Sequence, residues 1–161
     1  MEKELRRNRN TLVILGAGII AFGLWNAVKL VLFCALETDK LLELIGDLPE
    51  DVPVMPVVFI TVGILMLIDL SLRIYVGRSA RAVGLGKKRK RAYLVLAGIM
   101  AAGSLASMIY FVTGFSMDQY DSILDAAVTF LVELTSFVML AELLAAAFRI
   151  RKLTRALEEE G

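Results

Sequence analysis

The sequence predicts an all-α integral membrane protein, a four-helix transmembrane bundle that forms one domain over residues 1–161. Three observations lead to this fold class. The chain is 58% hydrophobic, which exceeds the usual share in a soluble globular domain. It holds four apolar runs, each with the roughly 20 residues that a helix needs to cross a bilayer. These runs also lack the period-2 alternation of a membrane β-strand.

The first apolar run covers about residues 11–36 and follows the charged start "MEKELRRNRN". This layout is shared with secretion signals. The run is too long for the apolar part of a signal peptide, however, and no small-x-small cleavage site follows it. We therefore expect an uncleaved first transmembrane helix.

Three further apolar runs complete the predicted spans, and they lie at about 54–76, 92–114 and 123–148. Two outer loops, 37–53 and 115–122, and a basic loop, 77–91, separate the four spans. The first outer loop contains "LLELIGDL", in which leucines alternate with acids in a helix-like pattern before Pro49. This pattern predicts a short amphipathic helix. The tail after residue 148 can extend the last span.

The distribution of charge predicts how the chain is threaded. Of the 18 Lys and Arg residues, 16 lie in the N-terminal tail, in Arg73–Arg91 or after Phe148. The outer loops and the start of the last span hold nine acids and one Lys. Because cytoplasmic loops are enriched in Lys and Arg, both termini are expected in the cytoplasm. We expect a multi-pass protein of the cell (plasma or inner) membrane.

Small residues recur at helical spacing in two of the spans. The third span places Gly98, Ala102 and Ala106 on one line, and the first span carries Gly16 and Gly23. Such lines allow close approach of helix backbones in lipid. They predict packing either within the bundle or, for one of them, between subunits.

Polar residues within the spans are the first candidate site. Counting inward along the helices places Asn26, Lys29 and Glu133 at similar depth, with hydroxyls from Thr129 and Ser104 nearby. One hypothesis is a buried Lys29–Glu133 ion pair whose hydrogen bonds Asn26 completes. The alternative is that the first span ends near Val28, so that Lys29 extends to the outer interface.

A second set of charges lies nearer the inner end of the spans. Asp69 and Arg73 have the i, i+4 spacing of an intrahelical ion pair. Glu142 lies near Arg149 in sequence and could meet Arg73 from the second span. This set is expected either to be structural or to form an inner carboxylate gate for a cation or proton.

The basic loop contains five consecutive cations, Lys87, Lys88, Arg89, Lys90 and Arg91. Such a cluster orients the chain and attracts anionic lipid headgroups at the cytoplasmic face, by about 1 kcal/mol for each residue. No nucleic-acid-binding fold accompanies it, so nucleic acid is not an expected partner.

The residue inventory limits the chemistry. With no His and one Cys, the chain cannot form a Cys/His zinc site, a His-ligated haem site or a His-based catalytic triad. We expect no cofactor, no metal and no catalysis.

The sequence therefore favours an interaction, regulatory or accessory subunit in the bilayer, as a homo-oligomer or with a membrane protein partner. The alternative is an oligomeric cation or proton channel or transporter that uses Lys29 with Glu133 and the inner acids Asp69 and Glu142.

Overall fold

The computed structural model describes residues 2–36, 54–87, 91–113 and 123–159. In these residues the chain forms four α-helices, α1 (Glu2–Leu36), α3 (Val54–Gly84), α4 (Ala92–Thr113) and α5 (Ile123–Glu159). Each contains a stretch long and apolar enough to cross a membrane. The all-α class with four potential spans is thereby confirmed. The amphipathic outer-loop helix lies outside the described residues, and the cytoplasmic position of the termini stays a prediction.

Three of the helices, α1, α3 and α5, extend further than their apolar runs. α3 continues to Gly84, so the connection to α4 is residues 85–91 and not 77–91 as expected. Ala and Arg in "RSARAV" are good helix formers and carry the helix past the apolar run. The helix ends where Gly86 adopts a φ of 83°, with the Lys87 N–H donating to the Ala82 carbonyl at 2.9 Å. This is a glycine-terminated C-cap. The tail extends α5 to Glu159, as predicted.

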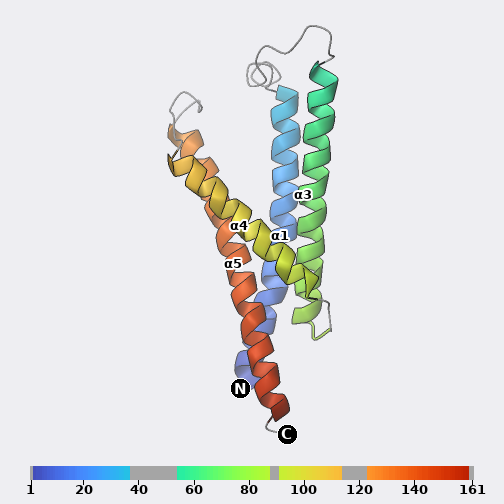
Figure 1. Cartoon of the computed structure of the whole chain (residues 1–161), viewed down its shortest axis with the longest axis vertical. Helices are drawn as coiled ribbons and strands as arrows, with labels where there is room; N and C mark the ends of the chain where they lie inside the picture. Colours follow the sequence, from blue (N-terminus) through green and yellow to red (C-terminus); the bar gives the residue numbers. More distant parts are fainter. Residues whose placement is uncertain (1, 37–53, 88–90, 114–122, 160–161) are drawn as a thin grey trace.

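The four helices form two antiparallel hairpins, α1 with α3 and α4 with α5 (Figure 1). Both chain termini and the α3–α4 turn lie at one end of the molecule, which we call the terminal end. The hairpins converge at the terminal end and diverge toward the opposite end, so the molecule is V-shaped.

Glycines set the contact between α1 and α3. A Cβ added at Gly16 would lie 2.6 Å from the Gly77 carbonyl oxygen, and one at Gly77 would lie 2.5 Å from the Gly16 carbonyl oxygen. One heptad along, a Cβ at Gly84 would meet the Arg9 carbonyl oxygen at 2.7 Å, and Gly23 faces Arg73 and Leu70. This seven-residue repeat is the packing of a left-handed helix pair. The first-span seam therefore packs within the chain.

The apolar core occupies the half of the molecule next to the terminal end. Its buried side chains are Leu12, Leu15, Ile19, Val76, Ala80, Tyr93, Leu94, Ala97, Ala101, Leu140, Leu143, Ala146, Ala147 and Ile150. These side chains come from α1, α3, α4 and α5, so the two hairpins pack against each other where they converge.

The predicted α4 seam is not the face that α4 buries. Ala97 and Ala101 are buried, whereas Ala102 and Ala106 are exposed, and a Cβ at Gly98 would have no heavy atom within 4 Å. The buried line also includes Tyr93 and Leu94. Those larger side chains bury more apolar area than the glycine line can, which favours this rotation of α4.

Candidate functional site: an arginine buried between three helices

Arg73 lies on α3, within the apolar part of the bundle. The exposed Arg78 is five residues, about 7.5 Å, closer to the terminal end of the helix. The side chain of Arg73 is nevertheless only 11% exposed. A charge inside a membrane span costs about 2.5–3.5 kcal/mol on insertion scales. The guanidinium therefore needs compensating contacts, and three helices supply them.

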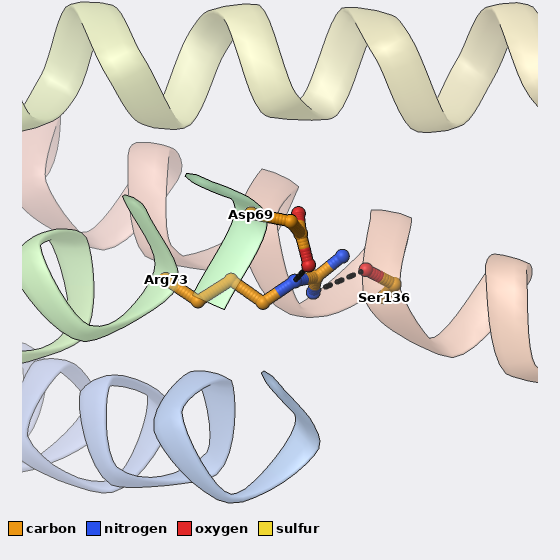
Figure 2. Close-up of polar contacts among 3 residues, drawn as sticks. All are labelled: Asp69, Arg73 and Ser136. Carbon is orange, nitrogen blue, oxygen red and sulfur yellow. Dashed lines mark hydrogen bonds and ion pairs between the residues drawn. The ribbon is translucent and has the colours of Figure 1, made fainter. Parts of the chain in front are cut away.

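Two hydrogen bonds hold the guanidinium group (Figure 2). Its Nε donates to Oδ2 of Asp69 at 2.8 Å, which is also an ion pair within α3. Its Nη1 donates to Oγ of Ser136 on α5 at 3.2 Å. Ser136 is buried, whereas the side chain of Asp69 is 47% exposed. Arg73 thus joins the α1–α3 hairpin to α5 by a charge-assisted hydrogen bond.

Helix α1 makes room for the arginine stem. A Cβ at Gly23 would lie 2.8 Å from Cδ of Arg73, so a larger residue would displace the stem. The Phe22 ring lies beside the guanidinium, with its centroid 5.9 Å from Cζ. A cation over an aromatic ring at this distance is stabilised electrostatically, and more strongly away from water.

The chemistry of this cluster is that of a fixed charge. An arginine guanidinium stays protonated in proteins, so Arg73 does not relay protons. The cluster lies one helical turn beyond Ile19, Val76 and Leu140 of the apolar core, toward the diverging end. Arg73 therefore holds α5 to the other hairpin at the depth where the hairpins begin to separate.

The sequence predicted one half of this cluster. The Asp69–Arg73 ion pair is confirmed. The proposed contact between Arg73 and Glu142 is wrong, because Arg73 reaches Ser136. Glu142 instead lines a groove with Arg149, between α1 and α5 near the terminal end. The inner charges therefore form two separate groups.

The sequence missed the contributions of Phe22 and Ser136, although Gly23 was identified as a packing residue. A glycine in one span, level with an arginine in the next, is a signal that could have indicated room for a long side chain.

The predicted mid-depth cluster does not form within the chain. Lys29 is exposed, and Asn26, Ser104, Thr129 and Glu133 are half-buried. Among the residues that the structure describes, no ion pair joins Lys29 to Glu133. Similar depth was the basis of that hypothesis, but α1 and α5 belong to different hairpins, which diverge toward this end (Figure 1).

The basic loop is described only at its edges, where Lys87 and Arg91 are exposed. Lys88, Arg89 and Lys90 lie outside the described residues. The contact of this loop with anionic lipids stays a prediction.

Comparisons with protein-family models, with curated proteins and with solved structures give no match.

Proposed function

We propose that this chain is a non-catalytic membrane subunit, with an interaction, regulatory or accessory role, that works by packing its spans against another membrane chain. The observation that carries the proposal is that the charges of Lys29 and Glu133 are not paired within the described residues. Both are charged residues of apolar helices, and neither has an ion-pair partner among the described residues. Charged groups inside membrane spans are usually paired, so a second chain would supply the missing partners.

The small-residue face of α4 supports the same role. Gly98, Ala102 and Ala106 are not covered by α5, and a Cβ at Gly98 or Gly103 would meet nothing within 4 Å. A line of small residues lets a neighbouring helix approach closely in lipid. The face therefore suits a helix of another chain.

The positions of the inner acids favour this role over cation permeation. Asp69 is bonded to Arg73, and Glu142 lines a groove that also contains Arg149 and Lys152. Asp69 is therefore paired with a fixed positive charge, and Glu142 lies at a separate place in a groove that carries three cations. A cation pathway would be better served by acids that share one surface without neighbouring cations.

The test is the number of chains per particle, measured by native mass spectrometry from mild detergent and by single-molecule photobleaching in vesicles. We expect more than one membrane chain per particle. Glu133→Gln should weaken the association about tenfold, because the cation of the neighbouring chain that pairs with Glu133 would lose its partner. Where the pair forms between two copies, adding Lys29→Met should restore part of the loss.

Thr135→Val is the matched control in the same helix. The Thr135 hydroxyl donates to the carbonyl of Leu131 in its own helix at 2.7 Å, so the substitution should leave association unchanged. Two results together would contradict the proposal. One is a particle that contains a single chain, and the other is a photo-crosslinker at residue 102 that captures no partner in intact membranes. Cation or proton flux through vesicles that Glu133→Gln abolishes would favour the alternative, an oligomeric channel or transporter.

A further inference from the structure

A groove of about 850 Å³ runs between the first turns of α1 and the second half of α5, near the terminal end. Both of its walls change from charged to apolar residues in the same direction. On α1 the change occurs after Thr11, and on α5 it occurs inward of Arg149. The groove therefore lies where the spans of both helices would meet the membrane surface.

Three cations border the middle of the groove, Arg7 from α1 and Arg149 and Lys152 from α5. All three are exposed, and no ion pair in the described part of the chain neutralises them. They offer guanidinium and ammonium N–H groups to one ligand from two opposite helices. Arginine binds phosphate oxygens in bidentate fashion, and lysine binds them as a point charge.

The two acids of the groove lie at its ends. The helices run antiparallel, so Glu4 lies toward the chain termini and Glu142 toward the membrane interior, seven residues or about 10 Å from Arg149. Three cations and two acids give the groove a formal charge of +1. This charge matches a ligand with one negative charge whose phosphate lies between the cations.

The apolar surroundings distinguish a lipid from a soluble phosphate. Ala145 and Ala146 line the groove beside the cations. Further inward, Ile14 follows Arg7 and Thr11 on one face of α1 and is 70% exposed. An acyl chain attached to the bound phosphate would lie along this apolar surface. A free phosphate ion would gain nothing from it.

We propose that the groove between α1 and α5 binds the headgroup of a singly charged anionic phospholipid, with Arg7, Arg149 and Lys152 on its phosphate and an acyl chain over Ile14. The site is distinct from the basic loop at Lys87–Arg91. It does not depend on the proposed subunit role.

The experiment is a lipid titration of the whole purified chain, followed by native mass spectrometry. Phosphatidylglycerol is the probe, phosphatidylcholine is the neutral lipid, and inorganic phosphate is the soluble competitor. We expect one phosphatidylglycerol to bind with at least about tenfold preference over phosphatidylcholine. Millimolar inorganic phosphate should not displace it, because the phosphate ion lacks an acyl chain.

Charge-removing variants locate the site. Arg7→Gln and Arg149→Gln should each weaken phosphatidylglycerol binding by at least about tenfold, the lower end of the range for a lost hydrogen bond to a charged group. Arg149→Lys keeps the charge and should lose less. Arg155→Gln is the matched control, since it removes one cation from the same helix outside the groove, and its affinity should stay within about twofold of the wild type. Far-UV circular dichroism and the melting temperature establish that each variant is folded.

Three results would overturn the proposal. One is an equal loss of affinity in Arg149→Gln and Arg155→Gln, which would mean general surface attraction. Another is equal binding of the neutral and anionic lipids. The third is full displacement by inorganic phosphate, which would assign the groove to a soluble anion.

Discussion

At the scale of single residues, the molecule is organised around Arg73. Its guanidinium is compensated by a carboxylate, a hydroxyl and an aromatic ring from three helices. Removing the guanidinium would leave the half-exposed Asp69 carboxylate without its ion-pair partner and the buried Ser136 hydroxyl without its donor. Arg73→Leu should therefore destabilise the protein in detergent by about 1.5–3 kcal/mol, the range for a lost hydrogen bond to a charged group, and the double variant Asp69→Asn/Arg73→Leu should recover part of this loss. Thermal unfolding of the purified chain measures both.

Arg78→Leu provides the comparison for that pair of variants. It removes the same type of residue from an exposed position on the same helix, where a charge contributes little. Equal destabilisation by Arg73→Leu and Arg78→Leu would show that the buried cluster does not stabilise the bundle.

The Ser136 hydroxyl permits a finer test at the same scale. It accepts the one hydrogen bond from Arg73 that crosses between hairpins. Ser136→Ala should lower the free energy of unfolding by about 1.5–3 kcal/mol, as expected for a hydrogen bond to a charged group. Thr113→Val, whose hydroxyl donates only to backbone carbonyls of its own helix, should change it much less. The same loss in both variants would mean that the hydrogen bond between Arg73 and Ser136 stabilises the protein no more than a hydrogen bond within one helix.

At the scale of elements, the α1–α3 hairpin depends on the absence of two Cβ atoms. Gly16→Ala and Gly77→Ala would each bring a methyl group against a backbone carbonyl, at 2.6 and 2.5 Å. The helices would have to separate, at a cost of about 1–3 kcal/mol. Gly63→Ala meets nothing within 4 Å and should be neutral or stabilising, because alanine favours a helix by about 1 kcal/mol. Thermal unfolding of the three variants compares them, and equal destabilisation by all three would contradict the packing of this hairpin.

The same scale shows what sequence can and cannot predict here. Run length predicted the four spans, and i, i+4 spacing predicted the Asp69–Arg73 pair, because both depend on one helix alone. The Lys29–Glu133 pair and the Arg73–Glu142 contact were inferred from depth. Depth fixes a position along the bundle axis but not the rotation of a helix or the separation of two hairpins. Ser136, a less conspicuous residue than Glu142, therefore became the partner of Arg73.

At the scale of the whole molecule, the two ends differ in what they bury. The apolar core and the groove lie in the half next to the terminal end, and Arg73 lies at the edge of that core. Toward the other end the hairpins diverge, and Lys29 and Glu133 lack an ion-pair partner in the described residues. One half of the molecule is thus stabilised within the chain, whereas the other carries the charges for which we propose an external partner.

The threading of the whole chain through the membrane follows from the same division. The termini and the α3–α4 turn share one end of the molecule (Figure 1), and most of the cations lie in these segments, so this end is predicted to face the cytoplasm. In a Cys34→Ser background, Lys3→Cys, Lys87→Cys and Arg155→Cys should react with a membrane-impermeant maleimide only after the cells are permeabilised. Asp51→Cys, in the acidic loop, should react in intact cells. Replacing the five cations Lys87–Arg91 by Gln should weaken the charge bias and yield a mixture of orientations, because Lys and Arg near the ends of spans set the topology. Labelling of Lys3→Cys and Arg155→Cys on opposite sides would contradict both the even number of spans and the shared end, whereas labelling of both from outside would reverse only the orientation.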